Sequence, residues 1–509
     1  IAIGCGAAFN NTTGSENTIV GHRSLIAGTV GSQITTLGNH AHHNNTTGIK
    51  NTAIGAYSNY TNSTGNNNTA VGFCSLKANT EGSLNVSLGS CSMLANTTGA
   101  SNVAIGISAM EKNISGGLNV ATGTYSLACN TTGADNTANG GYAMKENTTG
   151  TGNVGVGRSA LRCNTTADNN TAVGNAALCL NTGANNTAVG ATALLNNTIG
   201  TNNVAFGVCS LLSNTEGLKN TSIGMSTLRC NLTGCSNTAV GYTALLKNTA
   251  SDNTAVGCGA LICNTTGGAN TAVGALALDA NTTASNNIAI GNCALTRNTT
   301  GTQNTAIGVN ALSYNTTTSC NTAVGINALG FANGGCNTGV GAYALYKNDS
   351  GDICNVAVGA FALCDNVGNY NTAIGTSALC TNSTGDSNTA LGTSALSANT
   401  TADGNAALGF ESLKANTTGV ANTAVGRCAL ALNTTGCCNV GLGDRSLRSQ
   451  TTGMYNVAIG TLAGYDISTG DCNVLVGFQA GRSISPFTVT TEDNRLVLGH
   501  NTITNAYVK

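Results

Sequence analysis

A glycine recurs in this sequence at a nearly fixed interval, and this interval constrains the fold more than any other feature. The series runs from Gly4 and Gly21 to Gly477, and 23 of its 28 intervals are 17 residues long. The exceptions are four intervals of 16, ending at Gly190, Gly257, Gly341 and Gly375, and one of 18, ending at Gly359. So strict a period means that each unit makes the same contacts with its neighbours, which is typical of stacked coils.

The repeating unit reads Asn-Thr-Ala-Val-Gly, then x-x-Ala-Leu-x-x-Asn-Thr-Thr-Gly-x-x. Residues 171–174, Thr-Ala-Val-Gly, indicate a short strand that ends at glycine, with Ala and Val on opposite faces. The pair Ala177 and Leu178 predicts a second apolar wall, as either a second short strand or one helical turn. Residues 130–133, Asn-Thr-Thr-Gly, predict a turn in which the glycine is free to take positive φ.

These patterns predict an all-β fold, a parallel β-solenoid or β-roll of about 29 coils, one for each glycine of the series. One unit cannot bury its apolar face alone, whereas stacked units pair their backbones at about 4.8 Å. The alternative is a disordered low-complexity tract, which the fixed phase of Val and Leu disfavours. We expect residues 1–477 to form the shaft. Residues 478–509, with the only proline, Pro486, and Phe487, are expected to form a non-repetitive cap or a junction.

The composition excludes a large globular core. Charged residues make up 8% of the chain, aromatic residues 4%, and Trp is absent. The apolar residues are mostly Ala and Val, which fill a thin core repeated many times. The net charge of −1 gives no basic footprint for nucleic acid. No apolar run reaches the roughly 18–20 residues that cross a bilayer, and the start at Ile1 is interpreted as that of a processed or partial product.

The alternation of Ala and Val predicts self-association. If Ala and Gly line a thin coil, Val and Ile point outward, and an apolar row on the outside requires a partner. We expect a homo-oligomer or filament, with a trimer as one hypothesis. The alternative is a single solenoid whose core contains Val.

Two families share parts of this pattern. Thr-Ala-Val-Gly-x-x-Ala-Leu resembles the head repeats of trimeric autotransporter adhesins, which implies parallel β-rolls in trimers. The Asn-Thr-Ala-Val-Gly repeat more closely resembles tail-fibre-like proteins of phages and other viruses. Residues 494–501 and 506–509 resemble the stretch that precedes a self-cleaving chaperone in such fibres, which implies a chaperone-processed C-terminus.

Asn-x-Ser/Thr occurs at 27 positions, mostly at one place in the repeat. One interpretation is N-glycosylation on an exposed turn of a secreted protein. The other is that Asn and Thr form stacked hydrogen-bonding ladders. The candidate glycosylation sites are Asn11, Asn45, Asn62, Asn96, Asn113, Asn130, Asn147, Asn164, Asn231, Asn264, Asn281, Asn298, Asn315, Asn382, Asn399, Asn416 and Asn433. The second row, exemplified by Asn136, is expected to form an internal amide ladder.

Several of the 21 cysteines fall at matching places in successive coils. Neighbouring coils bring matched Cα atoms to about 5 Å, within the range for disulfides, and such bonds would indicate an oxidising compartment. Free cysteine as a small apolar filler is the alternative. The candidates are Cys74 with Cys91, Cys163 with Cys179, Cys320 with Cys336 and Cys354, and Cys364 with Cys380.

No catalytic, metal or cofactor site is expected. His40, His42 and His43 form the only histidine cluster, which is interpreted as a solvated loop because acidic partners are scarce nearby. Acidic residues are scattered singly, and no nucleophile elbow has a histidine partner. The aromatic residues, such as Tyr57 and Tyr125, are dispersed along the chain and predict no patch for stacking sugars.

The sequence therefore favours a non-enzymatic structural fibre on the surface of a cell or virus particle, with covalent N-glycans as its only expected addition. One alternative is an adhesin that binds host-surface glycans through the repeat face. Another is an ice-binding solenoid, whose regular Thr rows would order water.

Overall fold

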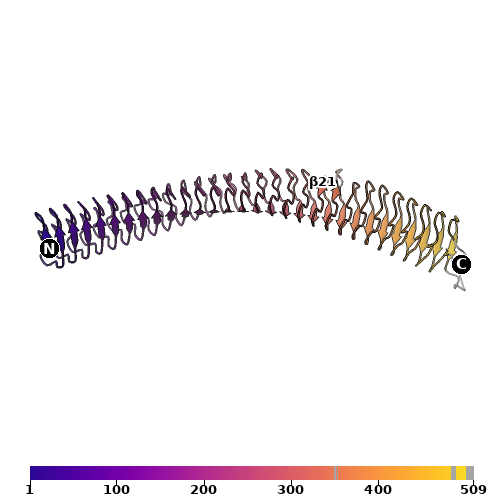
Figure 1. Ribbon diagram of the computed structural model, residues 1–509, viewed down its shortest axis with the longest axis horizontal. Helices are drawn as coiled ribbons and strands as arrows, with labels where there is room; N and C mark the ends of the chain where they lie inside the picture. Colours follow the sequence, from indigo (N-terminus) through magenta and orange to yellow (C-terminus); the bar gives the residue numbers. More distant parts are fainter. Residues whose placement is uncertain (349–350, 352, 483–488, 500–509) are drawn as a thin grey trace. The chain divides into compact units, whose positions relative to one another are not determined.

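The computed structural model describes residues 1–348, 351, 353–482 and 489–499. The chain forms two compact units, Ile1–Asn253 and Thr254–Lys509. Each unit is a parallel β-solenoid in which one short strand per coil stacks on the next (Figure 1). The predicted all-β solenoid with a 17-residue period is confirmed, with about 28 turns in all. No helix occurs in the described residues, so none of them belongs to a helix that could cross a membrane.

The strands are three residues long in nearly every coil. In the first unit they are β1 (Ala2–Ile3), β2 (Thr18–Val20), β3 (Thr35–Leu37), β4 (Thr52–Ile54), β5 (Thr69–Val71), β6 (Val86–Leu88), β7 (Val103–Ile105), β8 (Val120–Thr122), β9 (Thr137–Asn139), β10 (Val154–Val156), β11 (Thr171–Val173), β12 (Thr187–Val189), β13 (Val204–Phe206), β14 (Thr221–Ile223) and β15 (Thr238–Val240).

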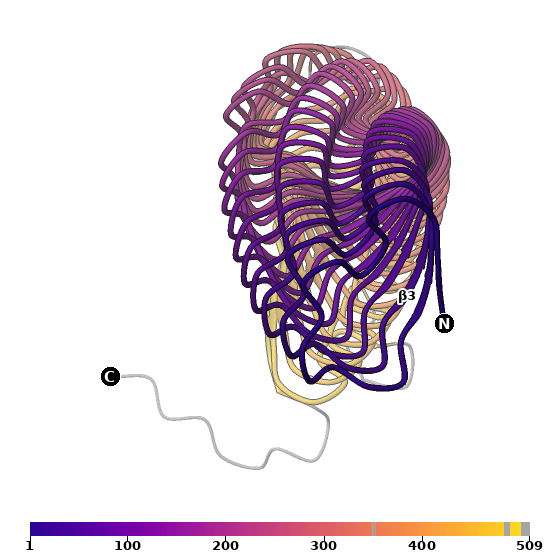
Figure 2. The same cartoon turned by 90° about the vertical axis from the view of Figure 1, so that its left-hand side faces the viewer.

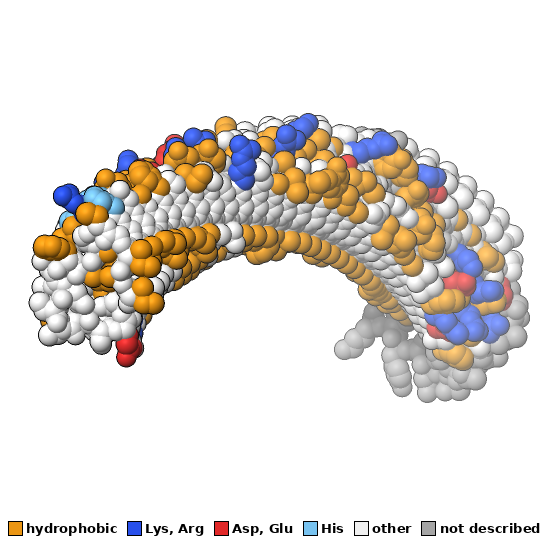
Figure 3. Space-filling view, turned by 60° about the vertical axis from the view of Figure 1, so that its left-hand side comes forward, with side chains coloured by type: hydrophobic (Ala, Val, Ile, Leu, Met, Phe, Trp, Pro, Cys, Tyr) orange, Lys and Arg blue, Asp and Glu red, His pale blue; other side chains and the backbone are white. Residues whose placement is uncertain are grey.

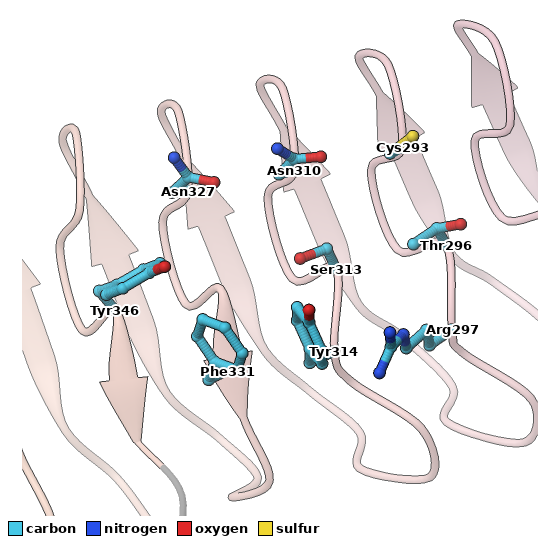
Figure 4. Close-up of a pocket in the computed structure, with 9 residues that line it drawn as sticks. All are labelled: Cys293, Thr296, Arg297, Asn310, Ser313, Tyr314, Asn327, Phe331 and Tyr346. Carbon is cyan, nitrogen blue, oxygen red and sulfur yellow. The ribbon is translucent and has the colours of Figure 1, made fainter.

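In the second unit the strands that continue this pattern are β16 (Thr254–Val256), β17 (Thr271–Val273), β18 (Ile288–Ile290), β19 (Thr305–Ile307), β20 (Thr322–Val324), β22 (Thr338–Val340), β24 (Val356–Val358), β25 (Thr372–Ile374), β26 (Thr389–Leu391), β27 (Ala406–Leu408), β28 (Thr423–Val425), β29 (Val440–Leu442), β30 (Val457–Ile459), β31 (Val474–Val476) and β32 (Leu496–Leu498). A separate pair, β21 (Phe331–Ala332) and β23 (Lys347–Asn348), lies on the far side of the coil from the main strands (Figure 4).

The strands pair in parallel and in register, equivalent residue against equivalent residue. Ala172 pairs with Ala188 although that interval is one residue short, because the strand itself is unchanged. The deletion is absorbed by the turn, where the Nδ2 of Asn181 reaches the carbonyl of Gly183 two residues on rather than three. The repeat therefore keeps its phase through the short coils.

Small and medium side chains fill the interior of each coil. The middle residue of the strand, such as Ala172, is fully buried, while its two neighbours face outward. Ala177 and Leu178 are fully buried on the opposite wall. The predicted orientation of Ala inward and Val outward is confirmed, and the core is one thin layer between two walls.

The glycine that follows each strand, hereafter the column glycine, is required for two reasons. Gly207 has φ +132°, a conformation that L side chains rarely adopt. A Cβ atom on Gly207 would also lie 2.5 Å from the carbonyl oxygen of Gly224 in the next coil. Column glycines thus lie against one another in successive coils of each unit, and Figure 2 shows successive coils of similar outline.

Two local predictions were wrong. The glycine of Asn-Thr-Thr-Gly, such as Gly133, does not take positive φ. A Cβ on Gly133 would lie 2.4 Å from the carbonyl oxygen of Gly150, so this coil is closely packed here, whereas Ala167 and Ala284 take the same place in other coils. The Ala-Leu segment of residues 177–178 is neither strand nor helical turn: Leu178 lies in the left-handed region at φ 50°. Each such residue costs about 1 kcal/mol or more, so packing of the Leu side chain must offset it.

One further main strand follows Gly477, and the glycine after it, Gly499, comes 22 residues later. Strand β32 pairs with β31 in the usual register, Val474 with Leu496. Pro486 and Phe487, on which the predicted cap partly depends, lie outside the described residues.

Candidate interaction surfaces

Two rows of buried asparagines run through each unit and satisfy the backbone of the turns. Asn130 donates from Nδ2 to the Oδ1 of Asn113 in the preceding coil, at 2.8 Å. In the second row Asn136 accepts from the backbone N–H of Asn153 at 3.0 Å and donates to the carbonyl of Gly150 at 2.8 Å. The side-chain amides of these ladders pair with backbone N–H and C=O groups that the turns would otherwise leave without a partner inside the core. The expected internal ladder of the second row is confirmed.

The candidate glycosylation sites belong to the first row, and the structure places them inside the coils. All of them except Asn11 have no exposed surface, and Asn11 is half-buried. The Nδ2 atom to which a glycan would be attached already donates hydrogen bonds, for example from Asn62 to Gly65 at 2.9 Å. This geometry favours the ladder interpretation of the motif. Glycan transfer could occur only before the coil closes.

The candidate disulfide partners lie in neighbouring coils, but all 21 cysteines are free thiols in the structure. The backbone N–H of Cys163 donates to the carbonyl of Cys179 at 2.9 Å. Burial raises the pKa of Cys163 to about 11. A hydrogen bond between the Cys364 and Cys380 thiols lowers the pKa of Cys380 to about 7 and raises that of Cys364. The inter-coil disulfides stay a prediction, and Cys364 with Cys380 is the pair whose thiols interact.

The remaining candidates differ in their surroundings. Cys74 is buried beside half-buried Cys91, and burial raises the pKa of Cys74. Cys320, Cys336 and Cys354 are exposed and each precedes an asparagine of the second row. They therefore form one exposed column on the turn side of the second unit.

The outward side chains of the strands form the sheet face. The last strand residue is Val, Ile, Leu or Phe in every coil from β2 to β15 except for Thr122 and Asn139. In the second unit it is Val, Ile or Leu in every main strand from β16 to β32. Leu88 is 45% exposed and Ile223 42%. Figure 3 shows a band of hydrophobic side chains without charged residues within each unit.

Basic and aromatic residues collect instead on the return segment, defined here as the six residues after each column glycine. Fifteen of the 19 Lys and Arg residues lie there. They are Arg23, Lys77, Lys112, Lys145, Arg158, Arg162, Arg229 and Lys247 in the first unit, and Arg297, Lys347, Lys414, Arg427, Arg445, Arg448 and Arg482 in the second. On the face seen in Figure 3, the Lys and Arg side chains (blue) lie away from the hydrophobic band.

Fifteen of the 20 Phe and Tyr residues lie on the same segment. They are Phe9, Tyr57, Tyr60, Phe73, Tyr125, Tyr142 and Tyr242 in the first unit, and Tyr314, Phe331, Tyr343, Tyr346, Phe361, Phe410, Tyr465 and Phe478 in the second. The prediction of dispersed aromatic residues was wrong, because coiling brings residues about 17 apart into contact. Tyr125 and Tyr142 stack at 5.6 Å, with the Lys145 ammonium 6.0 and 5.9 Å from their ring centres.

The histidine cluster belongs to this aromatic surface and is not a solvated loop. His40 stacks on Tyr57 at 5.3 Å and His43 on Tyr60 at 4.9 Å. His42 points inward at the position that Leu occupies in most coils, and it is fully buried. Its Nδ1 lies 2.9 Å from the Nδ2 of Asn59, and burial lowers the pKa of His42 to about 4. In the described residues no group of His, Cys, Asp and Glu could hold a metal ion.

Acidic residues on the turn side have a structural role. Asp168 accepts from the backbone N–H of Thr151 in the preceding coil at 2.7 Å, and Asp471 does the same for Met454. Ser83 fills the equivalent place for Asn66. These carboxylates therefore replace a backbone partner. Few Lys and Arg side chains of the return segment have a carboxylate partner, because the described part of the chain contains four ion pairs.

The second unit has a hollow of about 320 Å³ on its return segments (Figure 4). It is lined by Cys293, Thr296, Arg297, Asn310, Ser313, Tyr314, Asn327, Phe331 and Tyr346. Tyr314 stacks on Phe331 at 4.1 Å, and the Arg297 guanidinium lies 3.9 Å from the centre of the Tyr314 ring. Sequence reasoning missed this site because its members come from four successive coils.

Comparison with known proteins adds no family. No protein-family model matches the chain, and no curated protein sequence matches it. The regular coils are compatible with a repeat fibre protein, and a repetitive solenoid generally fits a structural or repeat-surface protein.

Proposed function

We propose that this protein is a structural fibre component on the surface of a virus particle or cell, built from copies of itself joined through the sheet face. The role is structural and not enzymatic, and a tail fibre is its most specific form. The observation that carries the proposal is the row of outward aliphatic side chains at the end of each strand.

This row has the properties of an interface. It contains no charged residue from β2 to β15 or from β16 to β32, whereas most Lys and Arg residues lie on the return segments. A regular apolar row of this extent is costly in water and is relieved when another surface covers it. A second copy carries the same spacing between coils, so identical rows match residue for residue along each unit. Three chains around one axis would cover all their rows together.

The mass of the particle in solution tests the proposal. We expect the chain to sediment at about three times its 50.3 kDa. Ile223→Lys places a charge on the sheet face, where the native side chain is 42% exposed, and should shift the mass toward the monomer. Leu180→Lys is the matched control, because Leu180 is 44% exposed but lies on a return segment. A monomeric parent chain, or equal effects of the two substitutions, would contradict assembly through the sheet face.

Ice binding is a second candidate, supported by the first strand residue. This residue is Thr in many coils, and Thr171, Thr187 and Thr322 are half-buried on the outward side of their strands. Thr and Val then alternate across a regular outward sheet. The same face cannot both bind ice and be covered by another copy. Thermal hysteresis by a monomeric chain would favour ice binding, and its absence would remove this candidate.

A further inference from the structure

The hollow around Arg297 brings together three kinds of group. It has an aromatic ladder, a cation and side-chain amides (Figure 4). Its position on the return segments leaves it outside the sheet face, so assembly through that face would keep it accessible. Its volume of about 320 Å³ is at the lower end of the range for small-ligand sites.

The aromatic ladder is held in place by contacts between coils. Tyr314 and Phe331 stack at 4.1 Å, and Tyr346 meets Phe331 edge to face at 5.1 Å. The stacked faces of Tyr314 and Phe331 are covered by each other, so what remains accessible is ring edge, hydroxyl and part of the outer faces. A nucleobase needs an open aromatic face for stacking, and the net charge of −1 gives little attraction for a phosphate backbone. These facts disfavour a nucleic acid.

The cation is available to an anion. The Arg297 guanidinium lies over Tyr314 and forms no ion pair with any carboxylate of the described residues. Asp279, in the preceding coil, instead accepts a hydrogen bond from Thr296 at 2.5 Å. Stacking on the ring fixes the plane of the guanidinium while its N–H donors stay free for a planar carboxylate.

The amides are available as well. Asn310 and Asn327 occupy the same place in neighbouring coils, and Figure 4 shows them side by side on the same side of the hollow. Unlike the buried rows, both are half-buried, and their side chains form no hydrogen bond within the described part of the chain. Coils repeat at about 4.8 Å, close to the length of one pyranose ring. An amide donates and accepts, as the hydroxyls of a sugar require.

We propose that this hollow binds an oligosaccharide that carries a carboxylate, of the uronic or sialic acid type. The carboxylate pairs with Arg297, the sugar C–H groups pack on the ring edges and the uncovered parts of the outer faces of Phe331 and Tyr346, and Asn310 and Asn327 bind hydroxyls. This site goes beyond the structural role and requires no particular oligomeric state.

Binding of oligogalacturonate to the full chain tests the site, with a neutral oligogalactan and a single-stranded oligothymidylate as comparison probes. Calorimetry gives the affinity, and tyrosine fluorescence, free of Trp emission, is a second readout to which Tyr314 and Tyr346 contribute among the 12 Tyr of the chain. We expect oligogalacturonate to bind more tightly than either comparison probe. Arg297→Gln should weaken it at least tenfold and leave the weak binding of the neutral probe unchanged.

Lys247→Gln is the matched control, since Lys247 occupies the same place as Arg297 in a coil of the first unit. It should change the affinity less than twofold. Phe331→Ala should weaken binding of both the acidic and the neutral sugar, and circular dichroism checks that each variant keeps its fold. The proposal is overturned if the parent binds no probe, if the nucleic acid binds most tightly, or if Arg297→Gln behaves as Lys247→Gln does.

Discussion

At the scale of single residues, the repeat is most informative where it is broken. His42 stands where most coils have Leu, and Asn59 takes the same place in the next coil. The two form one buried polar contact of 2.9 Å, which leaves the Nε2 of His42 and the Oδ1 of Asn59 without a partner. Such groups cost about 1–3 kcal/mol each when buried. The two coils that contain His42 and Asn59 therefore contribute less to stability than coils with Leu at this position.

The presence of His42 at a position that is Leu in most coils predicts that stability depends on pH. The pKa of His42 falls from 6.5 to about 4 on folding because burial disfavours the charged ring. Between these values only the unfolded chain binds the proton, so stability is unaffected above pH 6.5 and falls as the pH is lowered to 4. The loss of unfolding free energy between pH 6.5 and pH 4 amounts to roughly 3 kcal/mol. Hydrogen exchange of the coil around His42 at pH 7 and pH 4.5 measures it.

The control restores the repeat. His42→Leu should raise stability at neutral pH and remove this part of the pH dependence. A pH profile that is the same in the parent and in the Leu variant would show that His42 does not titrate across this range.

At the scale of the coil, the column glycine is the residue with least freedom to change. Gly207→Ala forces a side chain into φ +132° and against the backbone of Gly224, and we expect a loss of about 3 kcal/mol or more in unfolding free energy. Gly404 is the matched control. It has φ +67°, no atom lies within 4 Å of the place a Cβ would take, and other coils have Ser387 and Ala421 at this position.

Gly404→Asn should therefore change stability by less than about 0.5 kcal/mol. Denaturant unfolding of both variants measures the difference. Comparable losses at Gly207 and Gly404 would mean that the close approach of column glycines is not what requires glycine.

Contacts between coils also predict thiol chemistry. Cys380, whose pKa is lowered to about 7 by its hydrogen bond with Cys364, should be the most readily oxidised cysteine near neutral pH. Mild oxidation should join Cys364 to Cys380, and peptide mass mapping without reductant detects the bond. Cys364→Ser should leave Cys380 as a free thiol of higher pKa and slower alkylation. Slower labelling of Cys380 than of exposed Cys320 in the parent would contradict this assignment.

The sequence predicted the coil better than it predicted the surface. Period, strand position and the inward direction of residues such as Ala172 follow from alternation and spacing alone. The conformation of the Ala-Leu segment could not be predicted, because Leu178 adopts positive φ against its intrinsic preference under the control of packing. The site around Arg297 was missed for a geometric reason: its members are separated in sequence and meet only when coils stack.

At the scale of the whole molecule, each coil depends only on the coils next to it. Such a stack gains stability as a sum of similar coil and interface contributions. Deleting residues 191–207 joins Gly190 to Val208 and keeps every remaining residue in phase. We expect the shortened chain to fold with the same circular dichroism spectrum and a melting temperature within a few degrees of the parent.

An out-of-phase deletion provides the comparison. Removing residues 191–198 leaves a partial coil whose glycine cannot stack on its neighbours, and a cooperative loss of structure around it is expected. Equal melting curves for the two deletions would show that phase between coils does not control folding.

The shortened turn at residues 181–183 has a consequence for how such a protein changes between generations. A gene that encodes near-identical repeats is prone to unequal recombination and replication slippage. Most such events add or remove whole repeat units. The structure also accepts a unit that is one residue short, provided that the loss falls in the turn. Copy number can then drift without selection having to repair the protein, and length becomes an inherited trait that varies more freely than any single residue of the core.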